Sequence, residues 1–174
     1  MASGNTLIGF RAQDTCGPVT DYAQPDTEAG TSTPAEAIPV LDFEDGTATA
    51  GEYADFYGVF PRNYAGGGLT LTLYWLSAAT TGDCVWKAAF RRIADDAEDL
   101  TTTAHTYDYN SVTATTASAA GELDYAAITF TDGADMDSLA VGEAFILRIF
   151  RDSDAAGDTL AGDASLFAVE IKET

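Results

Sequence analysis

One run of apolar side chains at every second position constrains the fold more than any other feature. It comprises Leu69, Leu71, Leu73 and Trp75, with Thr70, Thr72 and Tyr74 between them. Side chains on a strand point alternately to opposite faces, so this spacing predicts a strand with one buried face. No segment sustains the 3.6-residue period of an amphipathic helix, and only 95–100 and 136–139 could form a helical turn.

Short polar turns separate seven further segments of strand-like composition. They are residues 38–43, 53–60, 84–93, 111–116, 123–130, 145–150 and 165–171. The pattern predicts an all-β fold, an antiparallel β-sandwich of eight or nine strands. The count favours a jelly roll over a seven-stranded immunoglobulin-type sandwich.

The N-terminal segment has a different composition, with three prolines and few large apolar side chains. Such a segment cannot form a core of its own. We therefore predict an extended arm over residues 1–37, with one strand at 6–11, followed by a β-sandwich domain over residues 38–174. The side chains expected to anchor the arm on a partner are Leu7, Ile8, Phe10 and Tyr22.

The chain carries 28 Asp and Glu against 8 Lys and Arg, a formal net charge of −20. Nucleic-acid binding and attachment to anionic membranes both depend on Lys and Arg, so neither partner is expected. No apolar run approaches the roughly 18 residues that span a bilayer, and the N-terminus does not have the pattern of a secretory signal. The acidity is typical of proteins adapted to high salt, and it would also keep free subunits from aggregating.

Residues with catalytic potential are few and scattered. His105 is the single histidine, and no Gly-x-Ser-x-Gly motif presents a serine nucleophile to it. Trp75 and Trp86 fall on apolar strand faces, which indicates core aromatics rather than sugar platforms of a glycosidase cleft. Two cysteines, Cys16 and Cys84, are expected to be free thiols. We therefore do not expect an enzyme.

One acidic loop has a spacing that partly matches a calcium site. Counting from Asp152, carboxylates fall at positions 1, 3, 7 and 12, with Gly157 at position 6. An EF-hand needs an oxygen ligand at position 5, where this loop has Ala156, and its flanking segments are strand-like. The loop is therefore not an EF-hand, but it could hold calcium between two strands; the alternative is a solvated acidic loop. The candidate ligands are Asp152, Asp154, Asp158 and Asp163.

Four stretches of the sequence resemble a group of small acidic all-β proteins encoded in tailed phages and prophages. They are Leu41-Asp42-Phe43-Glu44-Asp45, the stretch from Phe60 to Leu71 with its Gly66-Gly67-Gly68 turn, Arg151-Asp152, and the ending from Val169 to Thr174. The resemblance covers residues 38–174. In architecture and acidity the chain is also similar to the jelly-roll decoration, or cement, proteins that sit as trimers on phage capsids. Neither resemblance brings a catalytic motif, so no site residue is transferred.

The resemblance implies a virion structural protein on the capsid surface, made and assembled in the host cytoplasm. In this hypothesis the chain forms a homotrimer and stabilises the head by binding the lattice of the major capsid protein. The alternative is a carbohydrate- or receptor-binding β-sandwich module of a phage tail or fibre, using tyrosines as aromatic surface. The absence of any exposed aromatic pair would count against the alternative.

Overall fold

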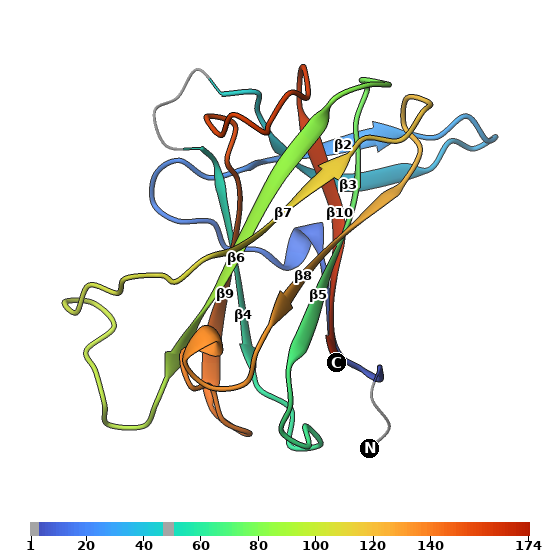
Figure 1. Ribbon diagram of the computed structural model, residues 1–174. Coiled ribbons are helices and arrows are strands. Elements are labelled where there is room, and N and C mark those ends of the chain that lie inside the picture. The colour runs from blue at the N-terminus through green and yellow to red at the C-terminus, as the bar shows by residue number, and fades with distance from the viewer. Residues whose placement is uncertain (1–3, 47–50) are drawn as a thin grey trace.

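The computed structural model describes residues 4–46 and 51–174, which form an all-β structure (Figure 1). In this part of the chain ten strands alternate with loops: β1 (Thr6–Arg11), β2 (Gln24–Ala29), β3 (Ala37–Phe43), β4 (Tyr53–Val59), β5 (Leu69–Leu76), β6 (Asp83–Ile93), β7 (Asn110–Thr115), β8 (Asp124–Phe130), β9 (Ala144–Arg151) and β10 (Ala164–Glu173). The helical structure consists of two 3-10 turns, η1 (Ala12–Asp14) and η2 (Ala134–Met136). The predicted all-β class is confirmed.

The strands form two antiparallel sheets. Sheet A has the order β2-β3-β10-β5-β8, with β1 also pairing with β10, and sheet B has the order β4-β9-β6-β7. Strand pairing is nested along the chain: β6 pairs with β7, and outside them β5 pairs with β8, β4 with β9 and β3 with β10. This is the pattern of one long hairpin rolled into two sheets. These eight strands, paired in this way in two packed sheets, form a jelly roll, as predicted. With β1 and β2 in sheet A the described residues form ten strands, more than the eight or nine predicted, because β2 was not expected in the polar N-terminal segment.

The core lies between the two sheets and follows the predicted alternation. Leu69, Leu71, Leu73 and Trp75 of β5 all point inward and are fully buried. Trp75 meets Trp86 of sheet B edge to face, with ring centroids 5.9 Å apart. Both tryptophans are therefore core residues, as their positions on apolar strand faces indicated.

The N-terminal segment is part of the sandwich and does not stand apart from it. β1 has the bounds predicted for it and pairs with β10, while β2 pairs with β3 along its whole length. Phe10 is only 9% exposed, and its ring centroid lies 5.3 Å from that of Phe56. The segment joins because β3 pairs with only the first part of β10, which leaves the remaining backbone groups of that edge for β1. Residues 1–3 of the predicted arm lie outside the described residues.

Candidate functional site

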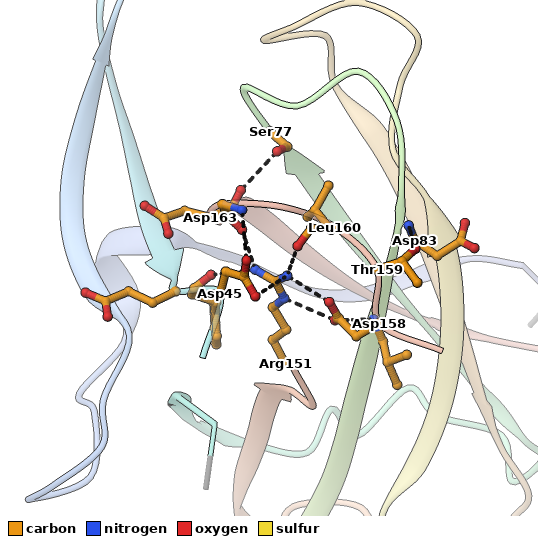
Figure 2. A network of polar contacts seen from close by, with 12 residues as sticks. Asp45, Ser77, Asp83, Arg151, Asp158, Thr159, Leu160 and Asp163 are labelled. Carbon is orange, nitrogen blue, oxygen red and sulfur yellow. Dashed lines mark hydrogen bonds and ion pairs between the residues drawn. The ribbon is translucent and has the colours of Figure 1, made fainter. Parts of the chain in front are cut away.

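A buried arginine organises the acidic loop between β9 and β10 (Figure 2). Arg151 ends β9 on its inward-facing side and is 0% exposed. Its guanidinium donates two hydrogen bonds to Asp158, from Nε at 3.1 Å and from Nη2 at 2.8 Å. It also donates to the backbone carbonyls of Phe43, Leu160 and Gly162, at 3.2, 2.7 and 2.7 Å. The loop thus wraps around a cation that belongs to the protein itself.

The four predicted calcium ligands do not converge on one point. Asp152 forms an ion pair with Lys87 at 2.5 Å, and Asp158 faces Arg151. Asp154 and Asp163 are exposed. Across residues 4–46 and 51–174, no three His, Cys, Asp or Glu side chains are grouped so that they could hold a metal ion. Calcium binding stays a prediction.

The sequence analysis missed Arg151 as the organiser of this loop. The available signal was its position, since it continues the inward-facing series Phe145, Leu147 and Ile149 on β9. A charged side chain at such a position must be paired and hydrogen-bonded inside the protein. The acidic residues that follow it then supply its partner.

A second polar cluster lies on the outer face of sheet B. Arg148 of β9 forms a bidentate pair with the buried Asp55 of β4, with both N–O distances 2.7 Å. Its guanidinium carbon lies 4.3 Å from the ring centroid of Tyr107 and 5.4 Å from that of Tyr53. The hydrogen bonds to Asp55 raise the pKa of Arg148 further above its usual range.

Besides Tyr53 of β4, the cluster takes two aromatic rings, Tyr107 and Tyr109, from the segment that joins β6 to β7. Figure 1 shows this segment leaving the sandwich at the left before it returns to β7. Tyr107 and Tyr109 stack at 5.8 Å, and Tyr109 packs edge to face on Phe150 at 4.9 Å. Burial raises the pKa of Tyr109 to about 12. The arginine and its aspartate bind each other, so this cluster serves to hold the segment on sheet B.

The outer face of sheet A also carries a pair of aromatic rings, of which Tyr125 is exposed and Tyr74 is half-buried. Tyr74 of β5 and Tyr125 of β8 are paired in register, with ring centroids 4.9 Å apart and planes at 80°. Tyr125 is 60% exposed. The register places four strands side by side around this pair, and we call their outward residues the tyrosine face: Thr6, Gly9, Arg11, Thr70, Thr72, Tyr74, Tyr125, Ala127, Thr129, Ala168, Glu170 and Lys172.

Glu170 is the central polar group of the tyrosine face. Its Oε2 atom accepts a hydrogen bond from the Tyr74 hydroxyl at 3.1 Å, and its Oε1 atom accepts one from the Thr6 hydroxyl. Burial and the hydrogen bond to Glu170 raise the pKa of Tyr74. An exposed aromatic ring beside a hydroxyl and a carboxylate that are held in place can contact both the apolar and the polar groups of a ligand.

The predicted partner-binding residues are mostly used by the chain's own core. Phe10 belongs to the core, and Leu7 and Ile8 pack against it from partly buried positions. Only Tyr22 remains substantially exposed, at 43%. No helix in the described part of the chain is long and apolar enough to cross a membrane. The homotrimer, the capsid partner and the absence of nucleic-acid binding stay predictions.

No family model and no curated protein matches this sequence. Solved structures do resemble the fold. The CBM22-1 xylan-binding domain of Paenibacillus barcinonensis Xyn10C has a TM-score of 0.54 and 10% identity, over 99% of this chain and 97% of that chain. A family 35 carbohydrate binding module from Clostridium thermocellum has a TM-score of 0.50 and 9% identity, over 98% of this chain and 100% of that chain. The chain therefore shares its β-sandwich fold with carbohydrate-binding modules.

Proposed function

We propose that this chain is a carbohydrate-binding β-sandwich module and that the tyrosine face holds the glycan. The observation that carries the proposal is the Tyr74–Tyr125 pair on the outer face of sheet A, in which Tyr125 is exposed and Tyr74 is half-buried. The apolar C–H side of a sugar ring packs on an aromatic ring, while its hydroxyls need hydrogen-bonding groups nearby. Glu170, Thr72 and the Tyr125 hydroxyl supply such groups around the pair.

The similarity of the fold to carbohydrate-binding modules supports the same function, but it does not identify the residues that would contact the glycan. One of the similar structures is named as a xylan-binding domain and the other as a carbohydrate binding module. At 9 to 10% identity no ligand contact can be carried over, so the site rests on this chain alone. These likenesses favour the alternative of the sequence analysis over the capsid decoration hypothesis.

The cluster on sheet B is the competing place for a glycan, and its geometry is less suitable. Arg148 and Asp55 already satisfy each other, and Tyr107 covers the guanidinium. A ligand there would have to displace these contacts, which costs free energy. The tyrosine face needs no such rearrangement.

Replacing Tyr125 by Ala tests the proposed site. We expect the Tyr125→Ala variant to bind its glycan about tenfold more weakly or worse, because loss of one aromatic stacking contact costs about 1 to 3 kcal/mol. Affinity electrophoresis against a panel of soluble polysaccharides, followed by calorimetry on the binders, measures this. The matched control is Tyr57→Ala, which removes a tyrosine of similar exposure, 50%, from sheet B. Equal losses in both variants would contradict the proposal.

The virion hypotheses stand beside this proposal as predictions that rest on the sequence resemblance. A glycan-binding face would suit a module on a tail or fibre that recognises a surface polysaccharide. Antibody labelling of purified particles separates the possibilities, because label over the head supports capsid decoration, whereas label at the tail tip supports receptor binding. The absence of enzymatic activity likewise stays a prediction.

A further inference from the structure

Basic side chains are scarce in this protein, and most of them are engaged. Of the 8 Lys and Arg, five form ion pairs with carboxylates among the described residues: Lys87, Arg91, Arg92, Arg148 and Arg151. Arg11, Arg62 and Lys172 have no ion pair within residues 4–46 and 51–174. With 28 carboxylates present, a basic side chain without an ion pair is an exception that needs a reason.

Two of these three side chains lie on the tyrosine face. Arg11 of β1 is opposite Ala168 of β10, which is opposite Tyr74 of β5. Lys172 lies on β10, two residues beyond Glu170. The third, Arg62, lies on the loop between β4 and β5, away from this face. Its guanidinium lies beside Gly142, which belongs to the loop before β9. The two basic groups therefore stand on either side of Glu170.

The register leaves an open place between Arg11 and the tyrosine pair. Two strand spacings separate the backbones of Arg11 and Tyr74, about 10 Å. The residue between them is Ala168, whose side chain is a single methyl group, and nearby Gly9 has no side chain; a Cβ added there would meet the backbone oxygen of Val169 at 3.9 Å. A sugar ring above Ala168 can contact Tyr74 at one edge and present a carboxylate to Arg11 at the other. Arginine binds a carboxylate with two parallel hydrogen bonds, which suits this edge.

We propose that the glycan bound by the tyrosine face carries carboxylates, that is, uronic acid units. The inference rests on the proposed carbohydrate-binding function. In it Arg11 binds the carboxylate of the sugar that contacts Tyr74, and Lys172 attracts a second acidic unit along β10. The two carboxylates nearest these basic groups already have partners: Glu170 accepts from Tyr74 and Thr6, and Asp14 accepts from the backbone N–H of Arg11 at 2.8 Å.

The overall net charge of −20 opposes an acidic ligand only weakly at this face. At physiological ionic strength the Debye length is about 8 Å, so carboxylates elsewhere on the surface are largely screened. A guanidinium in contact with the ligand is screened much less. Contact with Arg11 therefore outweighs the distant repulsion.

The test compares each acidic polysaccharide with its own neutral form. Polygalacturonate, alginate and glucuronoxylan are each assayed beside the carboxyl-reduced polymer, which keeps the same backbone. We expect the unaltered protein to bind at least one acidic polymer about tenfold more tightly than its reduced form, as one charge-assisted contact allows. This preference should shrink as NaCl rises from about 0.1 to about 1 M, because the Debye length falls to about 3 Å.

Variants then assign the preference to residues. Arg11→Gln and Lys172→Gln should each lower the ratio of affinity for the acidic polymer to affinity for the reduced polymer, about tenfold for Arg11→Gln. Arg62→Gln is the matched control, since it makes the same change in net charge away from the face. Arg11→Lys keeps the charge and should retain part of the preference. Melting temperatures of all four variants establish that they are folded.

Three results are decisive. Equal affinity for acidic and reduced polymers, or an Arg11→Gln variant that behaves like Arg62→Gln, overturns the uronic acid inference and leaves the carbohydrate-binding function intact. Failure of the unaltered protein to bind any polymer, acidic or neutral, overturns the proposed function itself. Selective loss of acidic binding in the two face variants supports the inference.

Discussion

At the scale of single residues, Arg151 has the clearest structural role. It lies at the end of β9 with no exposed surface, and its guanidinium donates hydrogen bonds to Asp158 and to three backbone carbonyls and forms a longer ion pair with Asp45 at 3.9 Å. Its partner Asp158 is also almost fully buried. A buried carboxylate left without its cation is strongly unfavourable, more so than loss of the hydrogen bonds alone.

Replacing this arginine should therefore destabilise the whole fold. We expect Arg151→Met to lower the free energy of unfolding by about 3 to 5 kcal/mol, because it leaves the buried carboxylate of Asp158 without its cation and removes the donor from three backbone carbonyls. Urea unfolding followed by tryptophan fluorescence measures this change. Arg62→Met, at an exposed position, should stay within about 0.5 kcal/mol of the unaltered chain. Equal stability of the two variants would contradict the role assigned to Arg151.

At the scale of elements, the N-terminal strand links stability to the candidate site. β1 contributes Phe10 to the core and Thr6 and Arg11 to the tyrosine face. The two roles follow from the alternation of a strand, whose inward side chains anchor it while its outward side chains meet solvent. β1 is therefore a structural part of the sandwich and of its proposed binding face.

Loss of the Phe10 ring tests this assignment. We expect Phe10→Ala to lower the free energy of unfolding by about 3 kcal/mol, because the ring packs between Phe56 and Phe145. Thermal unfolding and urea unfolding both measure this loss of stability. Tyr22→Ala, an exposed position in the same N-terminal segment, should change stability little. Unchanged stability in Phe10→Ala would instead favour the free arm expected from the sequence.

At the scale of the whole molecule, repulsion among carboxylates dominates the electrostatics. Burial raises the pKa of Asp42, and the neighbouring carboxylates of Asp26 and Asp163 raise it further. The pKa of Glu52 is also raised, mainly by burial and further by neighbouring carboxylates such as that of Glu44. Carboxylates are thus close enough around Asp42 and Glu52 to repel one another, as expected for a net charge of −20.

Salt should therefore stabilise this protein. Raising NaCl from about 0.1 to about 1 M shortens the Debye length from about 10 to about 3 Å and weakens the repulsion. We expect the melting temperature to rise by about 3 °C or more, which for a chain of this length corresponds to about 1 kcal/mol. Arg62→Glu, which makes the chain more negative, should show a larger salt response. A melting temperature that falls with salt would mean that the ion pairs outweigh the repulsion.

The sequence alone led to the calcium hypothesis because carboxylate spacing is a local property. It could not show that Arg151 occupies the centre of the loop, since this depends on which face of β9 meets the core. It also could not choose among the tyrosines. Tyr74 and Tyr125 become a pair on the outer face only because β5 and β8 are neighbours in sheet A.

The sequence by itself determined the all-β class, the strand at 6–11 and the buried face of β5 with Trp75. These properties depend on alternation within single strands, which is local. Tertiary structure alone decided that the N-terminal strand joins β10 and that Phe10 enters the core. It also brought Arg11 and Lys172, from opposite ends of the chain, onto one face beside the tyrosines. Strand order and register decide such neighbours, and they follow from how all the strands pack together rather than from any one of them.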